Sequence, residues 1–335
     1  MPTLLQSVIL LLAAALVIYL ACELFVNGVE WLGVRLSVGQ KATGSVLAAF
    51  GTALPESVVT LVAVAFGGTV HAKALGVGAA LGGPLALATI GYATVGLGML
   101  AFGRRLEATA ATREDFRQLA RDQGWFLGLF VVKIALGLVL FRWKPWLGLI
   151  FLAAYGLYLR KEMASGREMD GAPEPLLLAR SHATPPLATI LIQTGLALTA
   201  IFVASRLFVD QLGLLTPLLG VRPELVALLL SPIATELPET MNAIIWIRQG
   251  KHRLALANIS GAMMIQTTVP TAFALFWTPW HLDEPLLLAA GTTAVAILVM
   301  IMAFRRGIAS RRLLAAMALF YLTFIVLLVG FGLVR

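Results

Sequence analysis

Long apolar segments separated by short polar connections dominate the chain, and none of them alternates polar and apolar residues as a strand would. About 20 apolar residues in a helix cross the ~30 Å hydrocarbon core of a bilayer. A helix also satisfies its own backbone hydrogen bonds in lipid. The pattern therefore predicts an all-α integral membrane protein with ten transmembrane helices. The expected helices cover residues 4–26, 43–66, 72–101, 124–141, 145–160, 187–210, 223–247, 253–277, 285–304 and 313–334.

A polar connection over residues 161–186, with prolines, glycines and mixed charge, divides these helices into two groups of five. The expected organisation is a first repeat at 1–160, a cytoplasmic linker at 161–186 and a second repeat at 187–335. An offset of 183 residues aligns GTALPES at 51–57 with ATELPET at 234–240. Chance readily aligns leucines in such helices, but rarely T-x-L-P-E. Because each group has an odd number of helices, the halves form an inverted repeat of the kind found in secondary transporters.

Proline breaks the aligned helices near their middle. Pro55 and Pro238 have no N–H, so each removes a helical hydrogen bond and crowds the preceding turn. The sequence therefore predicts that transmembrane helices 2 and 7 are broken, with free carbonyls near Thr52 and Thr235. Free carbonyls at membrane depth are tolerated where they line a cavity or are buried in protein.

A glutamate follows each proline. An ionised carboxylate at this depth costs several kcal/mol without a partner, and the matching helices carry no Lys or Arg nearby. A bound cation would supply the partner for Glu56 and Glu239. Two carboxylates and the carbonyls near Thr52 and Thr235 make an oxygen-only site, the kind that Ca²⁺ prefers. The alternative is that both glutamates are protonated and hydrogen-bonded within the bundle.

Composition and charge agree with a membrane protein: 59% of residues are hydrophobic and 13% charged. The net charge of +8 reflects orientation, because 18 of the 25 Lys and Arg residues fall in loops on one side of the membrane. Those loops are expected in the cytoplasm and both termini outside, in a prokaryotic inner or plasma membrane. The first helix lacks a basic start and a cleavage site, so we expect it to be retained. The bilayer and inorganic cations are the expected partners, and nucleic acid is not.

Enzymatic activity is not expected. The sequence lacks H-E-x-x-H, G-x-S-x-G and paired intramembrane aspartates, and its four histidines lie at span ends or in loops. No cofactor is implied, and the oligomeric state cannot be inferred from an apolar surface.

GTALPES and ATELPET resemble the two alpha-repeat motifs of the cation/Ca²⁺ (sodium/calcium) exchanger superfamily. The segments at 74–84 and 255–266 are similar to the helices that follow these motifs. The resemblance implies that Glu56 and Glu239 are the paired Ca²⁺ carboxylates, and that Thr52 and Thr235 give backbone carbonyls. It also implies a secondary antiporter with alternating access, in which Ca²⁺ moves against Na⁺ or H⁺. The first and sixth helices would slide together against the rest.

The sequence departs from this pattern where Na⁺ would bind. Ala53 and Glu236 replace the serine of each motif, and Ala262 and Met263 replace a Ser-Asn or Ser-Asp pair. The lost side-chain oxygens favour H⁺ over Na⁺ as the counter-ion. Glu236 adds a third carboxylate to the metal site, where protons would compete with a divalent cation. Alternatively, Glu236 faces a vestibule or pairs with Lys133 or Arg206.

Further polar residues within the spans have more than one interpretation. The possible pathway residues are Asn242, Asn258, Gln266 and Met263. Methionines near the second motif leave a transition metal open as substrate, although packing is the more ordinary role. Lys133 is expected in an internal ion pair, or in place of a monovalent cation. The aligned pairs of helices 1 and 6 could form a gate: Glu23 with Arg206, and Asn27 with Asp210. An exchange-deficient channel or sensor of the same fold is a further alternative.

Overall fold

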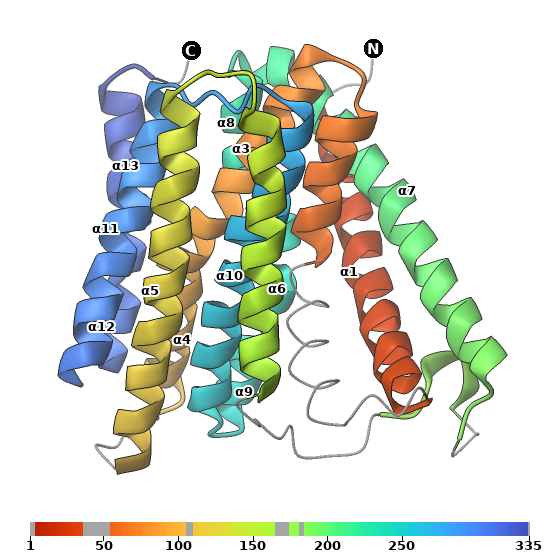
Figure 1. The fold of residues 1–335 in the computed structure, drawn as a ribbon, viewed down its shortest axis with the longest axis vertical. Helices are drawn as coiled ribbons and strands as arrows, with labels where there is room; N and C mark the ends of the chain where they lie inside the picture. Colours follow the sequence, from red (N-terminus) through yellow and green to blue (C-terminus); the bar gives the residue numbers. More distant parts are fainter. Residues whose placement is uncertain (1–3, 36–53, 105–109, 165–173, 181–183, 334–335) are drawn as a thin grey trace.

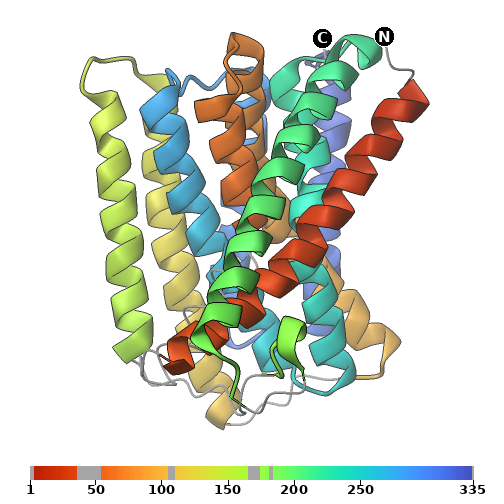
Figure 2. The ribbon, with the colours of Figure 1, turned by 90° about the vertical axis from the view of Figure 1, so that its right-hand side faces the viewer.

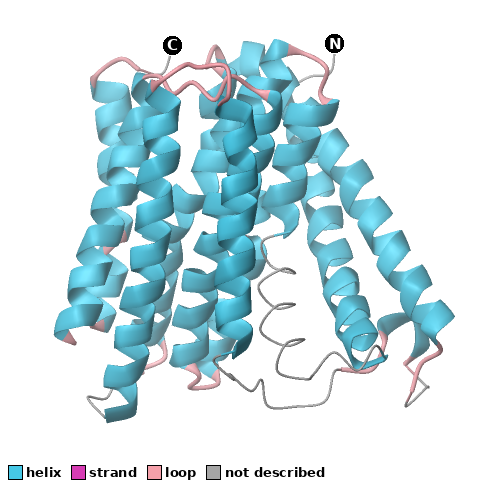
Figure 3. Cartoon of the chain, in the orientation of Figure 1, coloured by secondary structure: helices cyan, strands magenta, loops and turns pink. Residues whose placement is uncertain are grey.

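The computed structural model describes residues 4–35, 54–104, 110–164, 174–180 and 184–333. These residues form helices joined by loops and turns, and contain no strand (Figure 3). The all-helical prediction is therefore confirmed for the part of the chain that the structure describes. The helices are α1 (Leu4–Arg35), an unlabelled helix (Leu54–Phe66), α3 (Val70–Ala86), α4 (Tyr92–Ala101), α5 (Ala110–Leu138), α6 (Gly148–Ala164), α7 (Leu187–Leu219), α8 (Pro223–Thr235), α9 (Leu237–Arg248), α10 (His252–Trp277), α11 (Glu284–Arg306), α12 (Arg311–Ala316) and α13 (Ala318–Gly330).

Six segments of the described chain are long and apolar enough to cross a membrane. They are Leu4–Leu32, Val70–Ala101, Leu187–Leu219, His252–Trp277, Glu284–Arg306 and Arg311–Gly330. Two shorter apolar helices, Leu54–Phe66 and Pro223–Ile233, belong to the segments predicted to be broken. Some boundaries differ from the sequence-based ones: α7 continues past 210 to Leu219, and α5 begins at Ala110, before 124. Charged residues occupy the early turns of α5, which is why an apolar pattern did not predict them.

The helices form a bundle with one pair set apart (Figure 1). α1 packs more extensively on α7 than any other two described elements pack on each other. Figure 2 shows this pair running obliquely along one side of the bundle. The pair corresponds to the first and sixth predicted helices, which the sequence analysis aligns with each other.

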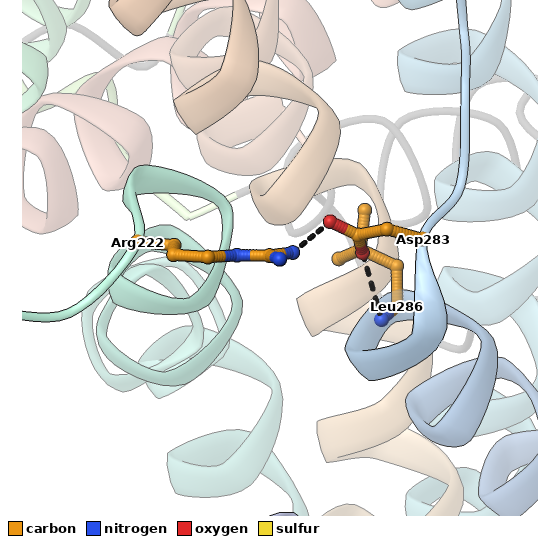
Figure 4. A network of polar contacts seen from close by, with 3 residues as sticks. All are labelled: Arg222, Asp283 and Leu286. Atoms are coloured by element: carbon orange, nitrogen blue, oxygen red, sulfur yellow. Dashed lines mark hydrogen bonds and ion pairs between the residues drawn. The ribbon is translucent and has the colours of Figure 1, made fainter. Parts of the chain in front are cut away.

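The two ends of the bundle differ in charge. The start of α1 and the end of α13 lie at one end, and the ends of α1 and α11 lie at the other (Figure 1). Basic residues such as Arg35, Lys251 and Arg306 belong to the second end. At the first end, Arg222 before α8 pairs with Asp283, which also caps the first turn of α11 through the backbone N–H of Leu286 (Figure 4).

The helix predicted to break at ATELPET is broken. α8 ends at Thr235 and α9 begins at Leu237, with Glu236 between them at φ −95° and ψ 1°. Pro238 lies in the first turn of α9, where its missing N–H costs no helical hydrogen bond. The corresponding residues Gly51, Thr52 and Ala53 lie outside the described residues, so a break in the second predicted helix stays a prediction.

Residues 174–180, which we call the linker clasp, bind both helices of the oblique pair. The side chains of Asn27 and Trp31 on α1 donate hydrogen bonds to the carbonyl of Glu174, at 3.2 and 2.8 Å. Gln193 on α7 accepts from the N–H of Leu178 at 2.9 Å and donates to Asn27 Oδ1 at 2.9 Å. Asn27 therefore holds the clasp instead of forming a gate with Asp210, which is exposed. Glu23 and Arg206 are also exposed, so neither aligned pair is buried as a gate.

Candidate functional site

Three glutamates from the two motifs are buried inside the helix bundle. Glu56 lies in the first described turn of the Leu54–Phe66 helix, Glu236 in the break, and Glu239 in the first turn of α9. Their side chains are 1%, 3% and 0% exposed. Charged residues are almost never this buried without a partner. The sequence prediction that Glu56 and Glu239 are deep in the protein is therefore confirmed, and Glu236, for which a vestibule position was the alternative, is equally buried.

Glu236 is held by hydrogen bonds from two neighbouring helices. Gln266 on α10 donates through Nε2 to Glu236 Oε2 at 2.6 Å, and Thr235 Oγ1 donates to Glu236 Oε1 at 3.0 Å. Both donors are buried. These bonds fix the direction of the carboxylate towards the bundle interior. The alternatives in which Glu236 pairs with Lys133 or Arg206 are wrong, because the structure shows no such ion pair and Arg206 is exposed.

Glu56 meets Glu236 and the backbone of α3. Neither carboxylate oxygen of Glu56 accepts a hydrogen bond from a donor within the described residues. The side chains of Glu56 and Glu236 are in contact. A Cβ placed on Gly83 would overlap the Glu56 carboxyl group, so α3 approaches it as closely as a glycine allows. Two buried carboxyl groups in contact need a proton or a cation between them, because two bare charges would repel.

The described side chains do not complete a metal site by themselves. No three His, Cys, Asp or Glu side chains in the described ranges are grouped closely enough to hold one ion. Thr52, the predicted carbonyl ligand of the first motif, lies outside these ranges, whereas Thr235 is buried beside Glu236. The donor set consists of carboxylate, amide and hydroxyl oxygens, which suit a hard cation that also takes backbone oxygens or water.

Lys133 on α5 is fully buried near this site, and its partner differs from the expected one. Its Nζ donates to the carbonyl of Ala80 on α3 at 3.0 Å. No described acid lies within ion-pair distance of it, although the charge of Glu56 acts on it. The expectation of an internal ion pair is therefore wrong.

The possible pathway residues separate into two groups. Gln266 is fully buried and contacts Glu236 directly, whereas Asn242 and Asn258 are half-buried. Met263 belongs to the main apolar core, where its sulfur accepts from Gln123 Nε2 at 3.7 Å. Met241 is 42% exposed, so it does not join Met263 in a thioether cluster. Packing therefore explains Met263.

Sequence reasoning missed Gly83 and several buried hydroxyls. Gly83 stands in a glycine-rich stretch, GVGAALGGP, whose one signal is that adjacent glycines in a buried helix permit close approach. Hydroxyl oxygens of Thr60, Ser231, Thr267 and Thr271 are buried without a hydrogen-bond partner among the described residues. Thr60 and Glu56 are one turn apart, as are Ser231 and Thr235. A turn-by-turn search from each motif would have found these two hydroxyls.

Comparison with known proteins agrees with the motifs. The family model described as "Sodium/calcium exchanger protein" matches residues 6–160 and 189–330. The inner membrane protein YrbG of Escherichia coli is 26% identical over 287 residues, covering 84% of this chain and 82% of that protein.

Two solved structures share the fold. The H⁺/Ca²⁺ exchanger CAX superposes with a TM-score of 0.73 at 18% identity, over 96% of this chain and 82% of that one. The sodium-calcium exchanger NCX_Mj superposes with a TM-score of 0.59 at 18% identity, over 96% and 99%. The family model spans both halves of the chain and both glutamate motifs. This chain therefore belongs to the sodium/calcium exchanger family of integral membrane proteins.

Proposed function

We propose that the chain is a secondary antiporter that exchanges a divalent cation, with Ca²⁺ as the first candidate, for H⁺. Family membership supports transport of cations over an enzymatic activity. The structural relatives are named as H⁺/Ca²⁺ and sodium-calcium exchangers, which is the reason to test Ca²⁺ first. The site residues would be Glu56, Glu236 and Glu239 with the backbone near Thr52 and Thr235.

The observation that carries this proposal is the contact between Glu56 and Glu236, one from each half of the chain. Neither forms an ion pair with a described Lys or Arg. A divalent cation would neutralise both carboxylates, and protons would do so in its absence. One site that holds either the cation or protons, but not both, is the minimum requirement for antiport.

The counter-ion follows from what the site lacks. Na⁺ coupling needs further oxygen ligands, and Ala262 and Met263 are packed in the apolar core without offering one. Glu236 stands where the family motif has a hydroxyl, and its hydrogen bonds from Gln266 and Thr235 hold it in the site. These features support H⁺ as counter-ion over Na⁺.

The full architecture belongs to the same proposal. We propose ten membrane helices in an inverted 5+5 repeat, with both breaks at the glutamate motifs and both termini outside the cytoplasm. The location of Arg35, Lys251 and Arg306 at one end of the bundle supports this orientation. The oblique α1–α7 pair would move against the remaining helices to expose the site alternately.

Transport in vesicles tests the function. The purified chain is reconstituted, and ⁴⁵Ca²⁺ uptake is followed under an imposed H⁺ gradient and, separately, a Na⁺ gradient. We expect uptake driven by H⁺ and abolished in Glu56→Gln and in Glu239→Gln. Glu284→Gln, at an exposed first-turn position of α11, is the matched control and should transport normally.

Different outcomes contradict different parts of the proposal. Uptake driven by Na⁺ alone would refute the counter-ion. Full transport by Glu56→Gln would refute the site. Dissipative Ca²⁺ flux without coupling to either gradient would identify a channel, and no flux of Ca²⁺, Mn²⁺ or other divalent cations would refute the antiporter.

A further inference from the structure

Lys133 is a buried cation with an unusual place in the molecule. The whole side chain is buried, and its Nζ lies 5.1 Å from the ring centre of Phe130 and 5.8 Å from that of Trp280. The indole N–H of Trp280 donates to the carbonyl of Lys133 at 2.8 Å, which fixes this part of α5. Aromatic faces attract an ammonium ion, so these two rings are suitable neighbours for the Lys133 head group.

The partner of this ammonium is a carbonyl that proline has released. Pro84 lies within α3 and has no N–H, so the carbonyl of Ala80, four residues earlier, has no helical donor. A carbonyl left bare inside a membrane protein costs free energy unless a donor or cation reaches it. Lys133 Nζ reaches it at 3.0 Å. The turn of α3 that lacks this hydrogen bond therefore offers a carbonyl oxygen to a cation, and the ammonium group of Lys133 occupies that position.

The same turn of α3 also meets the candidate site. Ala80 and Gly83 are three residues apart, so they lie on one face of the helix. Gly83 touches the carboxyl group of Glu56, and Ala80 binds the ammonium. The charges of Lys133 and Glu56 act on each other without direct contact, as a cation in an adjoining position would act.

We propose that Lys133 is a tethered monovalent cation, which occupies a carbonyl position on α3 that an alkali ion would otherwise take. The inference rests on the proposed function only in treating Glu56 as a cation ligand. It goes further by assigning a permanent occupant to a position that no free ion can enter. The position at the Ala80 carbonyl is then closed to transported Na⁺, whichever ion the glutamates bind.

Truncating Lys133 should open this position to free cations. Lys133→Ala leaves a space for Na⁺ or methylammonium at the Ala80 carbonyl, whereas Lys133→Met fills the space without charge. Lys251→Ala is the control, because Lys251 is an exposed lysine whose truncation opens no buried carbonyl position. It belongs to the loop between α9 and α10.

The readout is the thermal unfolding temperature of purified protein in sodium, methylammonium or choline chloride at equal ionic strength. Choline is too bulky for the space and serves as reference. We expect Na⁺ or methylammonium to raise the unfolding temperature of Lys133→Ala by about 3 °C over choline. The wild type, Lys133→Met and Lys251→Ala should show no difference among the salts.

Several results would overturn the assignment. One is Na⁺-specific stabilisation of the wild type, because the position would then be free. Another is a folded Lys133→Ala that responds to no cation, or a Lys133→Met that responds equally. If Lys133→Ala can be purified in folded form only when methylammonium or Na⁺ is present, the proposal is supported. If the variant cannot be purified in folded form in any of the salts, the proposal is contradicted. Since unfolding needs no transport, a wild type without flux would refute the antiporter and leave this test intact.

Discussion

At the scale of single residues, the contacts of each carboxylate matter more than their number. Glu236 has two hydrogen-bond donors, from Gln266 and Thr235, whereas Glu56 has none among the described residues. The Glu236 carboxylate is therefore oriented by the protein itself. The Glu56 carboxylate is oriented only by the cation or proton that it shares with Glu236. Glu236 is therefore the residue to substitute when the competition between protons and the divalent cation is measured.

Changing Glu236 to Gln should flatten the pH dependence of divalent-cation binding. In the wild type, lower pH weakens binding because protons and the cation compete for the carboxylates. With one carboxylate removed, the number of protons released per bound ion should fall from about two towards about one. Equilibrium ⁴⁵Ca²⁺ binding between pH 5.5 and 8 measures this slope. Glu224→Gln, at the far end of α8, should keep the wild-type slope; an unchanged slope in Glu236→Gln would remove Glu236 from the competition.

At the scale of elements, α3 and α8 pack closely because glycines on α3 lie against backbone carbonyls of α8. Pro232 in α8 frees the carbonyl of Leu228, and that oxygen lies against Gly82 of α3. One turn earlier, Gly78 lies against the backbone of Glu224. This spacing of small residues lets two membrane helices approach closely. It places α3 within reach of Glu56 at Gly83.

Gly82→Ala should lower stability and weaken cation binding together. The added Cβ would lie 2.6 Å from the Leu228 carbonyl oxygen and 2.9 Å from Pro232 Cγ, so α3 and α8 must separate. Overpacking of this kind costs about 1–3 kcal/mol, measurable as a lower unfolding temperature in detergent. Gly261→Ala on α10 has no heavy atom within 4 Å of its new Cβ and should leave the unfolding temperature unchanged or slightly higher. Equal effects of both substitutions would argue against the close approach.

The elements also show where sequence reasoning succeeds and where it stops. The helices, the break at Glu236 and the burial of Glu56 and Glu239 follow from apolar length, proline chemistry and the similarity of the two motifs. The partner of Lys133 could not be predicted from the sequence, because the carbonyl of Ala80 on α3 and the lysine on α5 are 53 residues apart. Contacts such as Gln266 with Glu236 depend on how whole helices pack. Apolar periodicity does not encode that packing.

At the scale of the whole molecule, α1 and α7 form one body. They pack along their length, and the linker clasp is bonded to both through Asn27, Trp31 and Gln193. A pair tied in this way would slide as a unit against the other helices. The proposed alternating access therefore requires no change between α1 and α7.

A disulfide between α1 and α7 should form and leave exchange intact. A Cβ at Gly28 would lie 3.5 Å from Thr194 Cβ, within the range found in disulfides. Gly28→Cys with Thr194→Cys is made in a Cys22→Ser background, because Cys22 is the chain's one cysteine. Gel mobility reports the crosslink, and ⁴⁵Ca²⁺ uptake is compared before and after reduction. Loss of uptake on oxidation that a reductant restores would show that the two helices move relative to each other.

The linker clasp also has a consequence for how the protein is made. Asn27 and Trp31 leave the ribosome well over a hundred residues before Glu174, the residue whose carbonyl they bind. Until that segment and α7 are synthesised, α1 has neither its backbone acceptors nor the helix on which it packs most. α1 is therefore made early but reaches its final position late, because it docks only after α7 has begun to insert.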